Sequence, residues 1–176
     1  MFCDQTTDGG GWTVVQRRFS PFSTNFNRNW AEYQFGFGST GGEFWLGNEN
    51  IHRLTASAPT ELRIDLAASG GHTGFAKYSW FYVGSGHEKY RWNMSGYSGN
   101  IGNSLYGFSH GPHNQRGMKF STPDQDNDLW PGGKCTQTSG WWYNWCGWAD
   151  LNLVGTIKWN EWAYKSSIIR SEMKLR

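Results

Sequence analysis

The chain lacks the features that mark several large classes of protein. Its 176 residues contain no apolar run near the roughly 20 residues that a membrane-spanning helix needs. There is no internal repeat, low-complexity tract or linker, so we expect one domain with its own core. The net charge is only +2, and Lys and Arg are scattered along the sequence. This balance excludes a strongly basic protein that binds nucleic acid or another polyanion.

Patterns that would indicate an enzyme are absent or out of context. The segment 36–41 matches the dinucleotide-binding pattern G-x-G-x-x-G, but it follows an expected helix and precedes an expected strand, the reverse of the required order. His87-Glu88 has no second histidine in the position that the zinc-protease motif requires. No pair of carboxylates stands out for glycoside hydrolysis. We therefore expect a binding module and no enzymatic activity.

Cysteine is scarce, and the count of three is odd. Cys135 and Cys146 are 11 positions apart (146 minus 135), which would suit a short disulfide loop. Cys3 would then be left over, either as a free thiol or as half of a bridge to upstream sequence. No signal peptide opens the sequence, so we expect a fragment of a longer secreted protein. The sequon Asn93-Met94-Ser95 predicts N-linked glycosylation at Asn93, consistent with secretion.

Aromatic residues and glycine are what the chain has in excess. Aromatic residues make up 18% of it, including 12 Trp, and there are 24 Gly. This composition is typical of a loop-rich, mostly β protein in which large rings fill the core between short elements. Rings that stack on sugar rings or on bases are the functional alternative, but with so many tryptophans most must be core.

Alternating hydrophobicity predicts antiparallel strands. In the segment 61–66, Leu62, Ile64 and Leu66 share one face and the charged residues share the other, as in a half-buried strand. Further strands are expected over 12–18, 43–46, 75–83, 89–94 and 167–175. Short helices are expected over 29–35 and 48–54, the second capped by Asn48. The segment 95–117 predicts loops.

The most informative segment runs from Asp124 to the second cysteine of the expected loop. Asp124, Asp126 and Asp128 alternate, and calcium is bound by six to eight oxygens from carboxylates, carbonyls and water. An EF-hand is excluded, because its sixth and twelfth positions are Leu129 and Cys135 instead of Gly and Glu. A solvated turn without an ion remains the alternative, since Asp and Asn are common turn residues.

Several long motifs, in order, resemble the fibrinogen C-terminal (fibrinogen-related) domain, found in ficolins, tachylectins, angiopoietins, tenascins and the chains of fibrinogen. They include Thr7-Asp-Gly-Gly-Gly-Trp-Thr-Val-Val-Gln-Arg-Arg18, Glu43-Phe-Trp-Leu-Gly-Asn-Glu49, Gly96-Tyr-Ser-Gly99, Asp126-Asn-Asp128 and Gly140-Trp-Trp-Tyr143. The resemblance implies an α+β fold over 1–176, without the family's N-terminal segment, which would hold the partner of Cys3. A central twisted antiparallel sheet with short helices would comprise about 1–95 and 167–176, and a loop-rich C-terminal calcium- and ligand-binding lobe about 96–166.

The resemblance also implies a structural calcium ion, Ca²⁺, as cofactor. Its ligands would be the side chains of Asp126 and Asp128 and the backbone carbonyls of Trp130 and Gly132, with Gly133 as an alternative to Gly132. Two carboxylates imply weak affinity, about 10⁻⁴ to 10⁻³ M. The Cys135–Cys146 pair matches the family's second disulfide.

Ligand contacts are implied beside that disulfide. In the family's acetyl-binding lectins, a cis peptide bond before the second cysteine turns neighbouring N–H groups toward the ligand. Here the bond is Trp145–Cys146, and the donors would be the N–H groups of Cys146 and Gly147. The lectins have His in place of Gly147, and a later glycine- and tyrosine-rich excursion is almost deleted here. Tyr143, Trp145 and Trp148 would either build a different platform or fill the core.

These features predict an extracellular, calcium-containing, lectin-like domain that binds glycans or acetylated groups on microbial or host surfaces, as in innate immunity or cell adhesion. The alternative is a receptor- or matrix-binding domain of angiopoietin or tenascin type, which the incomplete pocket motivates. Nucleic-acid binding and membrane insertion are not expected. The resemblance implies that upstream segments cluster such heads into oligomers, which would add avidity.

Overall fold

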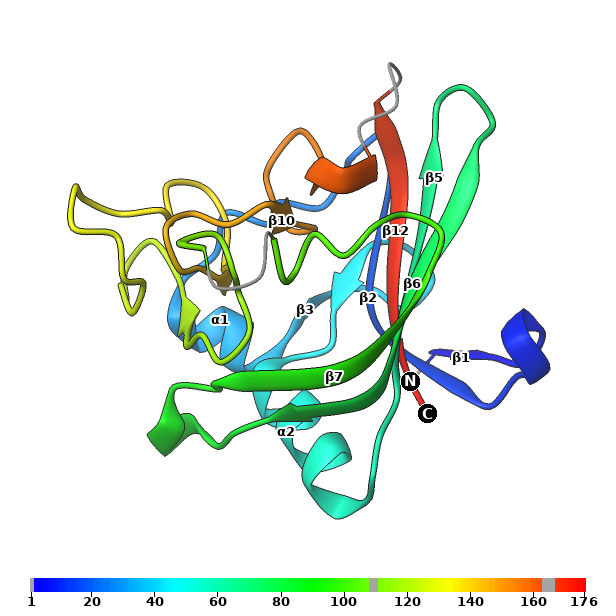
Figure 1. Cartoon of the computed structure of the whole chain (residues 1–176), viewed down its shortest axis with the longest axis horizontal. Helices are drawn as coiled ribbons and strands as arrows, with labels where there is room; N and C mark the ends of the chain where they lie inside the picture. The colour runs from blue at the N-terminus through cyan, green and yellow to red at the C-terminus, as the bar shows by residue number, and fades with distance from the viewer. Residues whose placement is uncertain (1, 108–110, 163–166) are drawn as a thin grey trace.

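The structure is a computed structural model that describes residues 2–107, 111–162 and 167–176. One antiparallel sheet runs through the molecule (Figure 1), in the order β3-β4-β2-β12-β5-β6-β7, with β1 beside β2. Its strands are β1 (Phe2–Asp4), β2 (Trp12–Phe19), β3 (Phe37–Gly38), β4 (Phe44–Trp45), β5 (Leu62–Ala68), β6 (Thr73–Val83), β7 (Trp92–Gly99) and β12 (Ile168–Leu175). The last strand lies between β2 and β5, so the two ends of the polypeptide meet in the sheet.

Strand β5 shows why this sequence forms a sheet with one buried face. Leu62, Ile64 and Leu66 are buried, whereas Arg63 and Asp65 lie on the opposite face. β5, β6 and β7 follow one another as an antiparallel meander. The predicted α+β fold and the predicted alternation in this segment are both confirmed.

Two short α-helices flank the sheet. Asn29 caps α1 (Trp30–Phe35) through a reciprocal capping box with Glu32. Helix α2 (Asn48–Ser57) has Gly47 at its N-cap, so the prediction that Asn48 caps it is wrong. The Asn48 side chain instead accepts a hydrogen bond from Trp45 Nε1 at 3.1 Å. No helix of the described residues is both long enough and apolar enough to cross a membrane.

The predicted strand over 89–94 departs furthest from its expected bounds, whereas the other predicted strands shift by one or two residues at one or both ends. β7 begins at Trp92, three residues later than expected, because Lys89 and Tyr90 have positive φ angles of 57° and 49°. These residues follow the 3₁₀ turn η2 (Gly86–Glu88). The strand then continues to Gly99, into the segment expected to be loop.

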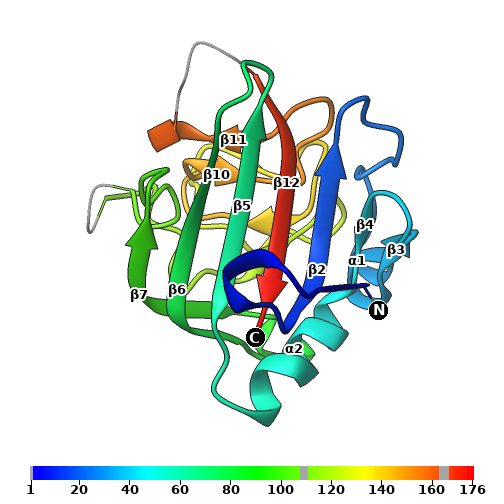
Figure 2. The same ribbon diagram turned by 90° about the vertical axis from the view of Figure 1, so that its right-hand side faces the viewer.

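The described residues between β7 and β12 form a loop-rich lobe on one side of the sheet (Figures 1 and 2). It contains two pairs of very short strands, β8 (Phe120–Ser121) with β9 (Trp141–Trp142) and β10 (Ala149–Asp150) with β11 (Lys158–Trp159), and the 3₁₀ turn η3 (Asn160–Trp162). Trp92 of β7 stacks on Trp142 of β9 with ring centroids 4.1 Å apart. Buried tryptophans therefore pack the lobe against the sheet. This agrees with the expectation that most of the aromatic residues belong to the core.

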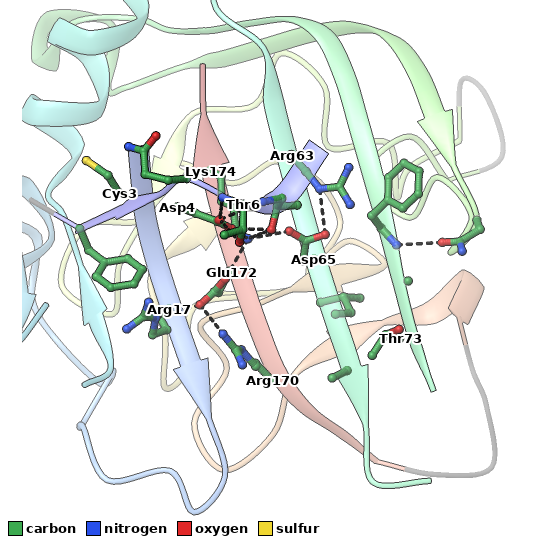
Figure 3. A pocket seen from close by; sticks show the side chains of 18 residues that line it. Cys3, Asp4, Thr6, Arg17, Arg63, Asp65, Thr73, Arg170, Glu172 and Lys174 are labelled. Carbon is green, nitrogen blue, oxygen red and sulfur yellow. Dashed lines mark hydrogen bonds and ion pairs between the residues drawn. The ribbon is translucent and has the colours of Figure 1, made fainter. Parts of the chain in front are cut away.

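The opposite face of the sheet carries β1 and the 3₁₀ turn η1 (Thr7–Gly9) (Figure 2). Under them, Lys174 of β12 contacts the carboxylates of Asp4, Asp65 and Glu172 at 2.6, 2.9 and 3.0 Å. Arg17 and Arg170 contact the same Glu172. These ion pairs line a cavity of about 630 Å³ (Figure 3). We call this set of charged residues the outer-face ion network.

Candidate recognition surface

The acidic segment of the lobe divides into two parts. Asp124 accepts hydrogen bonds from the backbone N–H of Trp30 at 2.9 Å and from the Thr122 hydroxyl at 2.8 Å. It therefore ties the lobe to the first residue of α1. Of the three alternating aspartates, this one faces the helix and leaves Asp126 and Asp128 as the carboxylates of the loop.

Asp128 organises that loop from its centre. Its two carboxylate oxygens accept hydrogen bonds from the backbone N–H groups of Trp130 at 2.9 Å and Cys135 at 2.8 Å. The Asp128 N–H in turn donates to Asp126 Oδ1 at 3.1 Å. The pKa of Asp128 is raised overall. Partial burial is the largest cause and the neighbouring Asp126 carboxylate adds to it, whereas the two N–H donors act in the opposite direction.

The donor set suits a hard, weakly held cation. No group of three or more His, Cys, Asp or Glu side chains in the described residues is arranged to hold a metal ion. Any ion at Asp126 and Asp128 would therefore need backbone carbonyls and water for its remaining ligands, which calcium accepts readily. Two neighbouring carboxylates repel each other, and a cation between them would remove that cost. The residues present thus fit calcium, with Trp130 and Gly132 following in the same loop.

The predicted disulfide is present. Cys135 and Cys146 are bonded, with their Cα atoms 4.9 Å apart, and Cys3 is an exposed free cysteine. The one cis peptide bond among the described residues is Ser20–Pro21, so the cis bond expected before Cys146 is not formed. Cys146 has a φ of 59° instead. The backbone still turns sharply here, but through a left-handed residue.

Gly147, an expected ligand contact, is enclosed by the protein. A Cβ atom at this position would lie 2.2 Å from Nε2 of the fully buried Gln115. That Nε2 donates to the carbonyls of Trp142 and Ala149, both at 2.9 Å. The Gly147 carbonyl accepts a hydrogen bond from Lys158 Nζ at 2.9 Å. A histidine at this position, as the resemblance to acetyl-binding lectins suggested, would displace Gln115, so packing occupies the place of the expected ligand contact.

Tyr143, a second expected ligand contact, belongs to the core. It is 3% exposed, and its hydroxyl donates to the Asp150 carboxylate and lies 2.8 Å from the Ser139 hydroxyl. Burial, and then the Asp150 carboxylate, raise the pKa of Tyr143 well above its usual value. The ring therefore fills the lobe: of the two alternatives for Tyr143, the core position is the one observed, and the predicted ligand contact is corrected.

The remaining expected aromatic contacts are at the surface. Trp145 is 43% exposed, and its carbonyl accepts a hydrogen bond from His113 Nδ1 at 2.9 Å. The His113 ring stacks on the half-buried Trp148, with centroids 5.8 Å apart. His113 thus links the backbone of Trp145 to the ring of Trp148, on either side of Cys146, although the sequence analysis did not include it among the expected ligand contacts.

Leu129 and Trp130 are exposed next to this group. Leu129 is 59% and Trp130 is 38% exposed. The Leu129 N–H donates to the Asn144 carbonyl at 3.1 Å, which sets the acidic loop against the residue before Trp145. We call Leu129, Trp130, Trp145 and Trp148 the recognition surface. The sequence analysis did not predict a binding role for Leu129. The only indication in the sequence is that this apolar residue lies between Asp128 and Trp130.

Asn93 of the predicted sequon lies in β7 and is half-buried. Its Oδ1 accepts a hydrogen bond from Arg116 Nε at 3.1 Å. Glycosylation at Asn93 stays a prediction.

Proteins of known sequence resemble this chain over most or all of its length. Human fibroleukin is 40% identical over 197 residues, and human angiopoietin-related protein 7 is 41% identical over 192; both alignments include the whole chain. Bovine angiopoietin-4 is 44% identical over 158 residues, or 88% of the chain. The matches cover 44%, 52% and 30% of these relatives, so the sequence spans about half of their length or less.

Solved structures share the fold. The fibrinogen-like globe domain of human ANGPTL2 matches with a TM-score of 0.89 and 36% identity, over 99% of this chain and 83% of that one. A lamprey fibrin D-dimer, in complex with the peptide Gly-His-Arg-Pro-amide, matches with a TM-score of 0.87 and 35% identity, over 99% of this chain and 63% of that one. The family model that describes the C-terminal globular domain of the fibrinogen beta and gamma chains matches residues 1–176. This chain therefore belongs to the family of fibrinogen C-terminal globular domains.

Proposed function

We propose that this chain is an extracellular protein-recognition domain that binds a receptor or matrix protein through its recognition surface. The observation that carries the proposal is the exposure of three large apolar side chains, Leu129, Trp130 and Trp145, on neighbouring backbone segments. Aromatic anchors with exposed apolar neighbours are the usual centre of a protein interface. No catalytic role is proposed for it.

Binding of a small acetylated sugar is the less favoured candidate. Such a pocket would draw on Tyr143 and on the position of Gly147, and both are enclosed by the protein. What remains is an aromatic surface, which suits a protein partner better than a single sugar ring.

The relatives support a protein partner. The sequence resembles angiopoietin-4 and angiopoietin-related protein 7 at 44% and 41% identity. The lamprey relative of the same fold was solved with a bound tetrapeptide. These likenesses favour protein or peptide ligands for this domain, in an extracellular setting that agrees with its disulfide.

We also propose a structural calcium ion in the loop. Asp126 and Asp128 would supply the charged ligands, and the carbonyls of Trp130 and Gly132 would complete the protein's share. When bound, the ion would neutralise the two carboxylates and hold Leu129 and Trp130 in place beside the disulfide. It takes no part in any chemical step.

The experiment uses the domain secreted from animal cells and clustered on streptavidin, so that weak binding becomes measurable. Its binding to cultured cells is followed by flow cytometry. We expect protease treatment of the cells to abolish binding, and glycosidase treatment or millimolar N-acetylglucosamine to leave it unchanged. The reverse pattern would establish the sugar-binding alternative instead.

The surface itself is tested with the double variant Trp130→Ala/Trp145→Ala. Loss of two anchors at a protein interface should weaken binding at least about tenfold. The matched control is Phe35→Ala on α1, which removes an aromatic side chain that is 71% exposed elsewhere on the molecule. Equal binding by both variants would show that the partner uses another surface.

A further inference from the structure

Trp80 is an exposed tryptophan in the middle of a strand. It lies in β6, outside the recognition surface, and is 41% exposed. Among the described residues, its side chain has no hydrogen-bond partner and stacks on no other ring. A large apolar side chain that is exposed on a strand is a candidate contact for a ligand or for a covalently attached group such as a sugar.

The strand register places the glycosylation sequon directly opposite this residue. Tyr82 pairs with Asn93, and Trp80 pairs with Ser95, across β6 and β7. Directly opposed residues in an antiparallel pair project to the same side of the sheet. Phe81, Val83, Trp92 and Met94 fill the core side, so the sequon and the two aromatic rings share the outer side.

Asn93 is suitably placed for attachment. β7 is the last strand of the sheet (Figure 2), and Arg116, which is exposed, donates to Asn93 Oδ1 at 3.1 Å. The oxygen of the carboxamide is thus engaged. Its Nδ2, the atom to which a glycan is joined, donates no hydrogen bond to any described residue.

We propose that Asn93 carries an N-linked glycan whose first N-acetylglucosamine packs on Trp80 and Tyr82. A polyprenyl-pyrophosphate-linked oligosaccharide would be the donor. Asn93 Nδ2 would form a bond to the anomeric carbon while the bond from that carbon to the pyrophosphate oxygen breaks. The polyprenyl pyrophosphate would leave, and the amide nitrogen would give up one proton to a base of the transferring enzyme. This proposal is independent of the partner proposed for the recognition surface.

The geometry brings a sugar within reach of both rings. Trp80 lies diagonally across from Asn93, a Cα separation of roughly 7–8 Å in an antiparallel pair, which long side chains span. A pyranose presents a face of C–H groups, and stacking it on an indole removes apolar surface from water. Trp80 and Tyr82 would therefore be covered in the glycosylated protein, which accounts for two aromatic side chains on this side of β6.

The first experiment asks whether the glycan exists. The domain is secreted from animal cells, and its intact mass is measured. We expect the mass of one glycan, lost in Ser95→Ala, which removes the sequon and leaves Asn93 and both rings in place. An unmodified mass for the original sequence would overturn the proposal.

The second experiment asks where the sugar packs. Thermal midpoints are measured for Ser95→Ala, Trp80→Ala and the double variant, all made in the same cells. If the sugar rests on Trp80, losing the glycan lowers the midpoint by about 2–4 °C when Trp80 is present and by much less in the Trp80→Ala background. An equal fall in both backgrounds would refute the contact.

Two controls make this result specific. Phe35→Ala removes an exposed ring on α1, far from the sequon in the sequence, and the effect of the glycan should remain at full size in that background. Trimming the glycan to its first N-acetylglucosamine should also leave the stabilisation unchanged. If trimming alone removes it, the outer sugars act by bulk, and packing of the first sugar on Trp80 is refuted.

Discussion

Gly147 shows how a single residue can close the position of an expected ligand contact. Its φ of 66° is in the left-handed region, and its missing side chain leaves room for Gln115. Gln115 is fully buried and links three backbone groups, the carbonyls of Trp142 and Ala149 and the N–H of Ala149. The glycine is therefore part of the packing of the lobe, and restoring a pocket residue there would disrupt that packing.

Gly147→Ala should lower the free energy of unfolding by more than the strain of placing alanine at a positive φ angle. The control is Gly155→Ala, because Gly155 has a φ of 77° but nothing within 4 Å of an added Cβ atom. Both variants carry the left-handed strain, and the Gln115 clash should cost Gly147→Ala about 1–3 kcal/mol more. Urea unfolding measures the difference. Equal losses would mean that Gln115 moves aside freely.

Single residues were only partly predictable from the sequence. The disulfide partners Cys135 and Cys146 were found from their spacing and the family resemblance. The sequence left open whether Tyr143 is core or platform, because its burial depends on Ser139 and Asp150, which the fold alone brings to its hydroxyl. A local motif shows which atoms are available, whereas burial is decided by residues that are distant in the sequence.

At the scale of elements, α1 is short enough to depend on its cap. Asn29 Oδ1 accepts from the Glu32 N–H at 2.9 Å, and Glu32 accepts from the Asn29 N–H at 3.0 Å. A helix of six residues gains little from propensity, so these bonds and its packing set its stability. The same helix offers the Trp30 N–H to Asp124 of the lobe.

Asn29→Ala should therefore cost about 1 kcal/mol of folding stability. Asn29→Ser, which keeps a capping oxygen, is the matched control and should recover most of the loss. Chemical denaturation measures both variants. A loss of the same size in the serine variant would show that the side-chain cap contributes nothing.

The acidic loop is the second element whose behaviour can be measured. With a dissociation constant of about 10⁻⁴ to 10⁻³ M, 10 mM calcium would stabilise the folded state by about 1.4–2.7 kcal/mol. We expect calcium to raise the thermal midpoint of the unmodified domain, and expect little effect in Asp126→Asn/Asp128→Asn. Asp124→Asn should keep the response, because Asp124 faces α1. A calcium response that survives in the double variant would place the ion elsewhere.

Among the elements, strands with clear alternation were easiest to predict. The alternation predicted over 61–66 was confirmed for Leu62, Ile64 and Leu66, which lie on the core face, although the strand itself runs over Leu62–Ala68. The start of β7 was misjudged, because the left-handed Lys89 and Tyr90 interrupt an aromatic run that reads as strand. Asn48 is an ordinary capping residue, but Gly47, with a φ of 105°, holds the N-cap.

At the scale of the whole molecule, the centre of the sheet is built from strands at opposite ends of the polypeptide. β12 pairs with both β2 and β5, and β1 pairs with β2 (Figure 2). Alternation alone predicts strands but not their order, so the central sheet was expected from the family resemblance. The outer-face ion network was missed, although Arg170, Glu172 and Lys174 alternate along the last strand.

That network should make the protein acid-sensitive. Burial acts to raise the pKa of Asp4 and Glu172, but hydrogen bonds from Lys174 and other donors outweigh it and hold both values below the ordinary 3.8 and 4.5. Because these pKa values are lower in the folded protein than in the unfolded protein, the unfolded protein takes up protons first as the pH falls. Their stabilisation is therefore complete above about pH 5 and is lost as the pH falls through the folded-state values.

Lys174→Met tests this coupling. Lys174 is buried and joins β12 to β1 and β5, so its removal leaves Asp4 without a cation and should cost about 3–5 kcal/mol at pH 7. Because the Asp4 pKa would then rise, the variant should also lose less stability than the original protein between pH 5 and pH 3. Lys134→Met, which removes an exposed lysine without an ion-pair partner among the described residues, should retain the original acid profile. Parallel profiles for the Lys174 variant and the original protein would show that carboxylates elsewhere control acid unfolding, and that the network acts only as packing between the two ends of the polypeptide.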